Sequence, residues 1–384
     1  MFKENNQHLQ PYLISNITDL PKKQQNLLED SWAGTFYQEV FCRIDEQNFN
    51  VLYVDFPSRP NAPVNEMVGL EMLKAGQGWT DEEMWHHYLF DLQTRRALGL
   101  EQLGEVHFEL RTIYNFRERL SRYMQETGIN LMDKVFAQVT DEQIEAYQIK
   151  TGRQRMDSTQ VASNIRQMGR IQLLVTVLQR VPRMLSEEDQ AHYAEALTPY
   201  TQGHAGQYVY RLKGEEIGDH LQRIGTLMQH LLVELKPAYE EEPIYQVLAR
   251  VFGEHFQMVE DAVHSKSNDQ LSASSLQSPD DLEATYRNKR GQGYQGYTAN
   301  ITETCEPENE LQLITKVQVA PNNVDDTQLL DEALPKLKER TELKMLYTDG
   351  GYGSPETDDA LRENDVEQIQ TAIRGRRPSA EKLH

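Results

Sequence analysis

The sequence has little cysteine and no long apolar run. Cys42 and Cys305 are the only two cysteines among 384 residues, which excludes a disulfide framework and a cysteine-based zinc site. No stretch approaches the 18 or more consecutive apolar residues of a membrane helix. The N-terminus, Met-Phe-Lys-Glu-Asn-Asn-Gln-His, lacks the apolar core of a signal peptide. These absences predict a cytoplasmic protein without a membrane partner.

Basic residues are also scarce, with 39 Lys and Arg against 60 Asp and Glu and a formal net charge of −21. Contact with phosphate requires Lys and Arg, so this balance argues against nucleic acid as a partner. The charges are uneven, however. Residues 151–183 contain six Arg and one acid, whereas residues 184–260 contain 13 acids and five bases. A nucleic-acid path along the first region therefore stays open.

One stretch has the pattern of a site. In residues 344–356 a short apolar run, Met345-Leu346-Tyr347, ends at Asp349, and three glycines follow before a helix start at Ser354-Pro355. An α/β sheet places catalytic or metal-binding carboxylates at such strand ends. The alternative is an ordinary turn, because Asp-Gly is a common turn dipeptide.

A second stretch, residues 155–164, repeats the pattern 192 residues upstream, since Asp157 stands where an extended run gives way to small polar residues. A long basic helix is expected directly after it, over residues 161–185. Because Asp157 and Asp349 share this strand-end setting, we expect them to come together in the folded chain.

Together these stretches resemble the DDE transposases of bacterial insertion sequences. The resemblance rests on Asp157-Ser158-Thr159 and on Tyr347-x-Asp349-x-Gly351-Tyr352, and it extends to residues 284–287, 296–304 and 313–322. It covers most of the chain from about residue 60 onward. It implies a ribonuclease-H-like catalytic domain in which Asp157 lies on the first strand and Asp349 follows the fourth.

The expected fold class is α/β (α+β), a ribonuclease-H-like mixed sheet interrupted by a long helical insertion. We expect an N-terminal arm in residues 1–60 and a helical transposase N-terminal DNA-binding domain in residues 61–135. The incomplete DDE catalytic domain would occupy residues 149–384, with the helical insertion at 167–264 and a Ser-rich linker at 265–280. Strand signals over residues 294–304 and 311–319 predict an antiparallel pair.

The resemblance also implies the chemistry. Such enzymes hydrolyse a phosphodiester bond at a transposon end and transfer the freed strand to target DNA, using two Mg²⁺ (or Mn²⁺) ions. Asp157 and Asp349 would be the catalytic residues and the metal ligands. Synapsis of two transposon ends makes a homodimer the expected assembly.

The family also uses a third carboxylate, a glutamate on a helix farther downstream. The printed sequence ends at His384 before such a helix, which leads us to expect a truncated enzyme that lacks this ligand. Two alternatives stay open: a non-catalytic DNA-binding transposase remnant, and a metal-dependent nuclease of the same fold.

Basic and aromatic residues around positions 286–297 form the clearest candidate DNA-binding cluster, with Arg287, Lys289, Arg290 and Tyr294 as its main members. A hairpin with edge lysines is the alternative interpretation. Arg117 and Arg119, on a helix expected over residues 109–124, are further candidates, although a solvated helix face produces the same pattern.

Overall fold

The computed structural model describes residues 1–10, 15–54, 60–165, 167–289 and 291–371. The chain divides into two compact units. Unit 1 comprises Met1–Arg155, Thr302–Val317 and Lys336–Leu346. Unit 2 comprises Met156–Ile301, Gln318–Pro335 and Tyr347–His384. None of the helices in the described part of the chain has the length and apolar character that a bilayer crossing requires.

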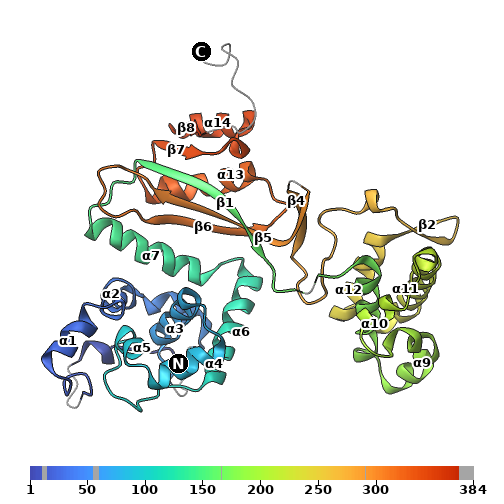
Figure 1. The fold of residues 1–384 in the computed structure, drawn as a ribbon, viewed down its shortest axis with the longest axis horizontal. Helices are drawn as coiled ribbons and strands as arrows, with labels where there is room; N and C mark the ends of the chain where they lie inside the picture. Colours follow the sequence, from blue (N-terminus) through green and yellow to red (C-terminus); the bar gives the residue numbers. More distant parts are fainter. Residues whose placement is uncertain (11–14, 55–59, 166, 290, 372–384) are drawn as a thin grey trace, which may run out of the picture. The chain divides into compact units, whose positions relative to one another are not determined.

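Helices that share one apolar core make up most of unit 1 (Figure 1, blue to teal). They are α2 (Trp32–Glu39), α3 (Val64–Gln77), α4 (Asp81–Phe90), α5 (Leu92–Ala97), α6 (Leu110–Thr127) and α7 (Leu131–Ala146), with the 3-10 turns η2 (Phe41–Arg43) and η3 (Glu46–Leu52). Unit 1 also contains α1 (Lys22–Glu29) and the 3-10 turn η1 (Gln7–Leu9). The sequence Thr80-Asp81-Glu82-Glu83 predicts a capping box, with Thr followed three residues later by Glu. The structure confirms it, because Thr80 and Glu83 each accept a hydrogen bond from the other's backbone N–H at the start of α4. A second capping signature at Thr140–Gln143 lies inside α7 and starts no helix.

The first 60 residues contribute to the same core as the helices that follow. Phe41 and Phe49 are fully buried and belong to one cluster with Met67 and Ile113. The division into an arm at 1–60 and a domain at 61–135 stays a prediction. The shared core nevertheless shows that these segments pack as one body, because burying large aromatic side chains is strongly favourable.

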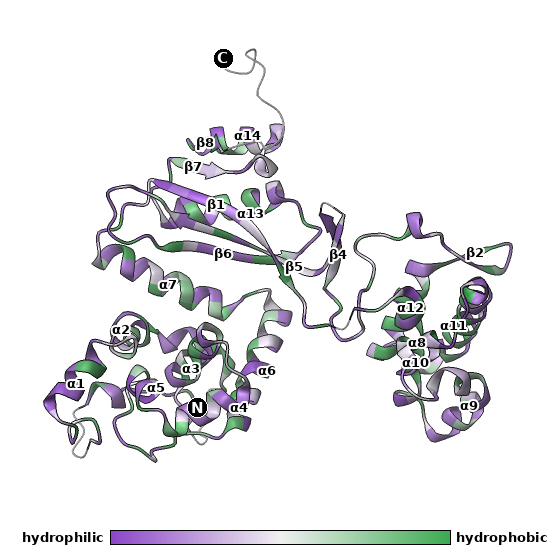
Figure 2. Ribbon diagram, in the orientation of Figure 1, coloured by the Kyte–Doolittle hydropathy of each residue, from purple (hydrophilic) through white to green (hydrophobic). Residues whose placement is uncertain are grey.

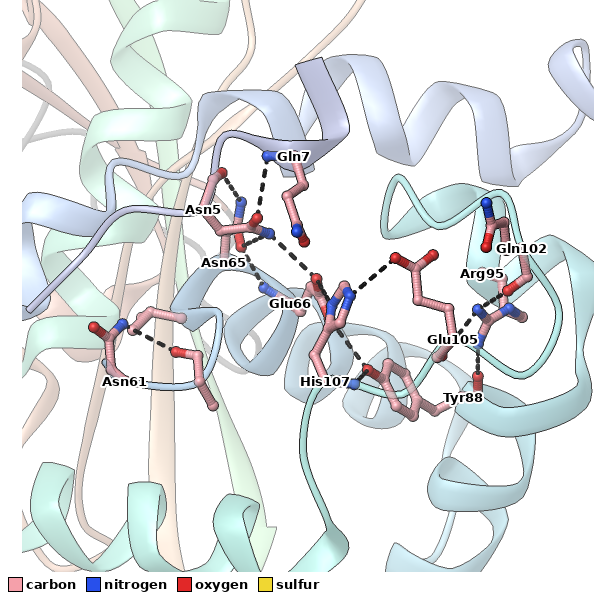
Figure 3. Close-up of polar contacts among 12 residues, drawn as sticks. Asn5, Gln7, Asn61, Asn65, Glu66, Tyr88, Arg95, Gln102, Glu105 and His107 are labelled. Carbon is pink, nitrogen blue, oxygen red and sulfur yellow. Dashed lines mark hydrogen bonds and ion pairs between the residues drawn. The ribbon is translucent and has the colours of Figure 1, made fainter. Parts of the chain in front are cut away.

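Buried polar groups fasten the N-terminus to this core (Figure 3). The Asn5 side-chain amide donates to Glu66 Oε1 (3.2 Å) and to Asn65 Oδ1 (3.1 Å). Glu66 also accepts from the Tyr88 hydroxyl (3.2 Å) and contacts His107 Nδ1 (2.7 Å). Buried polar groups of this kind are tolerated because each has a partner.

A six-stranded mixed sheet is formed by β1 (Arg153–Ala162), β4 (Thr285–Lys289), β5 (Gln292–Thr304), β6 (Ile314–Pro321), β7 (Met345–Thr348) and β8 (Glu367–Gln370). Its order is β4-β5-β1-β7-β8, and β6 also pairs with β5. Helix α13 (Asp326–Arg340) connects β6 to β7, and α14 (Pro355–Glu363) connects β7 to β8. The chain is therefore a mixed α and β protein, as expected.

Backbone hydrogen bonds fix the strand directions. Cys305 N–H donates to Arg153 O (2.9 Å) and Ser163 N–H donates to Gln295 O (3.1 Å), so β1 and β5 are antiparallel. The expected antiparallel pair of β5 and β6 is confirmed by bonds from Thr304 to Leu313 and from Asn322 to Gly296. The N–H groups of Lys344 and Met345 both donate to Gly152 O, so paired strands β1 and β7 start at the same edge and run parallel.

The more deeply buried face of β5 is polar. Thr298, Asn300, Thr302 and Thr304 are almost completely buried, whereas Tyr297, Ala299 and Ile301 are half-buried. On β1 the buried Gln154 accepts from the Thr315 hydroxyl (2.6 Å) and donates to the Thr341 hydroxyl (2.8 Å). Figure 2 shows β1 largely in the purple of hydrophilic residues. Side-chain hydrogen bonds therefore contribute to holding the sheet together.

The helical insertion has a core of its own within unit 2. It contains α8 (Arg170–Leu178), α9 (Glu187–Thr201), α10 (Ala205–Tyr210), α11 (Ile217–Tyr239) and α12 (Pro243–His255), with the turns η4 (Val181–Arg183) and η5 (Gly214–Glu216). Two expectations were wrong. The long helix expected over 161–185 begins only at Arg170, because β1 stays paired with β5 as far as Ser163. Helical structure expected to about residue 264 ends at His255, where the β2 (Phe256–Val259) and β3 (Ala262–Ser265) hairpin follows.

The Glu66–His107 contact predicts a pH-dependent stability of unit 1. The hydrogen bond to Glu66 raises the pKa of His107 above its ordinary value. A raised pKa contributes stability that is complete below the ordinary histidine pKa of about 6.5 and is lost as the pH rises through the folded value. The melting temperature should therefore fall above about pH 6.5, and His107→Gln should reduce that slope. The exposed His86→Gln is the control; equal slopes in the wild type and His107→Gln would contradict this account.

Candidate active site

Asp349 lies where the sequence predicts, directly after β7. Leu346 and Thr348 of this strand are buried, and the exposed Asp349 caps the short 3-10 helix η7 (Gly350–Tyr352). Its Oδ1 accepts a hydrogen bond from Gly351 N–H at 2.8 Å. The strand end and its cap therefore hold this carboxylate at the surface.

Asp157 lies in the middle of β1, which corrects the expectation that it stands at a strand end. Burial alternates along the strand, so that Met156 is buried and Asp157 is exposed. The strand continues to Ala162 because its backbone remains bonded to β5. Asp157 Oδ1 accepts a hydrogen bond from Ser158 N–H (2.9 Å), which orients the carboxylate against its own strand.

Asp326, the first residue of α13, brings a third carboxylate that the sequence analysis missed. Its Oδ1 accepts a hydrogen bond from the Ser158 hydroxyl at 2.7 Å. A Cβ atom at Gly351 would lie 2.8 Å from Asp326 Oδ2 and 3.0 Å from Asp349 Oδ1. Two carboxylates from different elements therefore flank this glycine. The available signal was an aspartate between a strand and a helix, the same setting as Asp349.

The fully buried Tyr352 links these residues to the sheet. Its hydroxyl donates to Asn300 Oδ1 (2.7 Å), and the Asn300 amide donates to Gln318 Oε1 (2.8 Å). Burial and then the charges of Asp326, Asp157 and Asp349 raise the pKa of Tyr352 far above its ordinary value. The three carboxylates therefore lie within electrostatic range of one hydroxyl, although whether Asp157 and Asp349 share an ion stays a prediction.

Asp157 and Asp349 are suitable as metal ligands by their chemistry. Both are exposed carboxylates, and Mg²⁺ prefers oxygen ligands and is commonly held by one or two carboxylates with several waters. Within the residues that the structure describes, no group of three or more His, Cys, Asp or Glu side chains is arranged to hold a metal ion. Each residue alone therefore has the ligand chemistry that Mg²⁺ requires, and one oxygen of Asp349, Oδ1, is already engaged by Gly351 N–H.

The candidate DNA-binding cluster lies on the β4–β5 hairpin. Arg287 is half-buried on β4, and its guanidinium donates to the backbone oxygens of Asn322 (3.1 Å) and Val324 (3.5 Å). Lys289 is exposed at the end of β4, and Tyr294 lies half-buried on β5. Arg290 lies outside the described residues. The hairpin of the alternative interpretation is therefore present, and a role in DNA binding stays a prediction.

Arg117 and Arg119 lie on α6, and both have partners within unit 1. Arg117 binds Asp81 (2.6 Å) and Glu71 (2.7 Å), and its hydrogen bond holds the pKa of Asp81 well below the ordinary value. The Arg119 guanidinium lies 5.2 Å from the centre of the Tyr53 ring. Two carboxylates neutralise Arg117, which favours a structural role for it over phosphate binding.

Comparison with known protein families identifies part of the chain. Residues 271–382 match the family model of the transposase DDE domain. The matched segment includes β4 to β8 with Asp326, Asp349 and Tyr352, whereas Asp157 and the helices before it lie outside. No curated protein and no solved structure was found to match. The resemblance to insertion-sequence DDE transposases is confirmed by this segment.

The Tyr352 hydrogen bond predicts the effect of a single-atom deletion. Tyr352→Phe leaves Asn300 Oδ1 buried without its partner, which should cost about 1–3 kcal/mol in the free energy of unfolding. Urea denaturation followed by circular dichroism measures the loss. Tyr210→Phe is the control, since Tyr210 is 92% exposed and should tolerate the change. Equal stability of the two variants would show that the buried hydroxyl contributes nothing.

Proposed function

We propose that this chain, which carries a transposase DDE domain match over residues 271–382, is the DNA transposase of an insertion sequence. Its reaction would be metal-dependent hydrolysis of a phosphodiester bond at a transposon end, followed by attack of the freed 3′-hydroxyl on target DNA. The observation that carries the proposal is the position of Asp349 inside the matched segment, where Gly351 lies between it and Asp326, whose carboxylate accepts a hydrogen bond from the residue next to Asp157, Ser158.

The strand arrangement supports a ribonuclease-H-like catalytic domain. Taken as β6-β5-β1-β7-β8, the sheet has three antiparallel strands followed by strands that run parallel to β1. The first and second strands of that fold would be β1 and β5, with the helical insertion between them. We further propose that the helices of unit 1 serve as the transposase N-terminal DNA-binding domain.

We assign the metal-binding role to Asp157 and Asp349, with Mg²⁺ or Mn²⁺ as the ion and two ions in a complete enzyme. A divalent ion bound there supplies activation of the attacking oxygen and stabilisation of the leaving oxygen. The protein's own side chains do the positioning. The Ser158–Asp326 hydrogen bond ties β1 to the start of α13, and the Tyr352–Asn300–Gln318 hydrogen bonds tie η7 to β5 and β6.

We assign DNA contact to the β4–β5 hairpin, with Arg287 and Lys289 facing phosphate and Tyr294 beside them. Exposure of Lys289 and the mixture of basic and aromatic residues support this assignment. The DNA partners would be transposon ends and target, and two chains would act together in synapsis. A DNA-binding protein without catalysis is the alternative, because it would share the fold and the hairpin.

Cleavage of transposon-end DNA tests the catalytic proposal. Any Mg²⁺-dependent nicking of DNA that flanks the coding sequence should fall by roughly three powers of ten in Asp157→Asn and in Asp349→Asn, since stabilisation of the leaving oxygen is worth several kcal/mol. Asp358→Asn, an exposed residue on α14, is the matched control. Titration with Mn²⁺, followed by electron paramagnetic resonance, should show weakened binding in the two site variants only.

The outcomes separate the candidates. Cleavage that survives both site substitutions would refute the assignment of Asp157 and Asp349. Absence of cleavage in the wild type, together with specific binding to the same DNA, would fit both the non-catalytic alternative and an enzyme that lacks its third carboxylate.

Salt dependence tests the hairpin assignment. Replacing Arg287 and Lys289 together with Ala should weaken DNA binding and reduce the slope of log K against log salt by about 1.8, because each phosphate contact releases roughly 0.9 counterion. Lys23→Ala, at an exposed position of α1, is the control. A slope equal to that of the wild type would show that the two residues do not contact phosphate and that their role is confined to the structure of the hairpin.

A further inference from the structure

A cavity of about 580 Å³ lies within unit 2, outside the carboxylate site. Its lining comes from α8, the end of α12, the segment 268–277, β4 and the turn after β6, and includes Arg170, His255, Ser275, Tyr286, Arg287 and Asn323. The volume is that of a typical small-molecule site, for which the usual range is about 300–1,000 Å³. The Ser-rich segment therefore forms a wall of this cavity, although the sequence predicts only a linker there.

Hydrogen bonds to three other elements fix that wall. Tyr286 N–H on β4 donates to Ala273 O (3.0 Å), and the Asn323 amide donates to Ser274 Oγ (2.8 Å). Leu276 N–H donates to Glu254 Oε2 on α12 (2.8 Å). The cavity is therefore bounded by a connected frame, which reduces the ordering cost that a ligand would meet on binding.

Polar groups without a protein partner gather around the cavity. His255 is only 4% exposed, and both of its ring nitrogens lack a hydrogen-bond partner among the described residues, as do Ser275 Oγ and Arg170 Nε. Burial, together with Arg170 and Lys266, lowers the pKa of His255 to about 4. The imidazole is therefore neutral at pH 7, with one donor and one acceptor available. A base edge offers the complementary pair of groups.

The cavity also has positive charge. Arg170 donates to the backbone oxygens of His255 (2.6 Å) and Lys266 (2.7 Å), and Arg287 donates to those of Asn322 and Val324. Backbone carbonyls satisfy the N–H groups but do not cancel the charge, whereas a phosphate would do both. Met168, Leu173 and Leu271 supply apolar lining for a ring.

We propose that this cavity binds one nucleotide, with the base held by His255 and Ser275 and the phosphate by Arg287. A nucleotide has two sources, an unpaired residue of a DNA strand and a free nucleotide, and the first source rests on the proposed function. Arg287 belongs to both the β4–β5 hairpin and the cavity lining. A DNA strand bound along the hairpin would therefore pass the cavity, where one unstacked base can bind.

Two variants test the cavity. Ala273→Trp adds a ring at an exposed lining position, with Ala262→Trp on β3 as a control outside the cavity. His255→Phe keeps the ring but removes the donor and the acceptor. The melting temperature should not fall in His255→Phe, because the change also removes two unpartnered buried nitrogens. A structural role and a binding role for His255 thus predict different results.

The probes are a fluorescein-labelled duplex with a three-nucleotide single-stranded tail, the same duplex with blunt ends, and thymidine 5′-monophosphate followed by calorimetry. We expect the wild type to prefer the tailed duplex. Ala273→Trp and His255→Phe should bind it about tenfold more weakly, the loss expected for one held base, with blunt-duplex binding unchanged.

Each outcome is decisive. Binding of thymidine monophosphate alone, weakened in both variants, would support the cavity with a free nucleotide as its ligand, even if the DNA cleavage assay failed. Wild-type affinity of both variants for every probe, or weakening in Ala262→Trp equal to that in Ala273→Trp, would overturn the proposal while leaving the transposase assignment untouched.

Discussion

Hydrogen bonding between buried polar side chains sets the register of the sheet on which the candidate site depends. Gln154 near the start of β1 bonds to Thr315 and Thr341, and Asn300 of β5 bonds to Tyr352 and Gln318. A slip of one residue would turn each of these groups to the opposite face and leave it without its partner. An apolar face tolerates small rearrangements more easily, since dispersion contacts are not directional. The polar face therefore gives precision to the positions of Asp157 and Asp349.

The same pairing explains how a large insertion can separate two neighbouring strands. β1 ends at Ala162 and β5 begins at Gln292, yet the two strands are bonded along their length. The entropy of closing a loop grows only with the logarithm of its length, so a long excursion adds little cost. The helices of the insertion bury a core of their own, which offsets the cost of ordering them. The helical insertion therefore leaves the pairing of β1 with β5 intact, although it separates the two strands widely in the sequence.

Features set by neighbouring residues were predictable from the sequence, and those set by distant partners were not. The strand end at Asp349 and the cap at Thr80 depend on a few adjacent residues, and both were predicted correctly. The end of β1 depends on its partner β5, so the sequence placed Asp157 at a strand end and started a helix too early. Asp326 was missed because it approaches Gly351, and with it Asp349, only in the folded chain. The cavity wall formed by residues 268–277 could not be predicted either, because its partners on β4 and α12 and after β6 are distant in the sequence.

Gly351 allows two carboxylates, those of Asp326 and Asp349, to approach each other because it has no side chain. It donates its N–H to Asp349 and leaves the space into which Asp326 also extends. A methyl group at this position would clash with the carboxylates of Asp326 and Asp349. Any larger residue at position 351 would therefore push apart these two acids, one at the start of α13 and the other after β7. Protein engineers who redesign the surrounding acidic groups should therefore keep glycine at position 351.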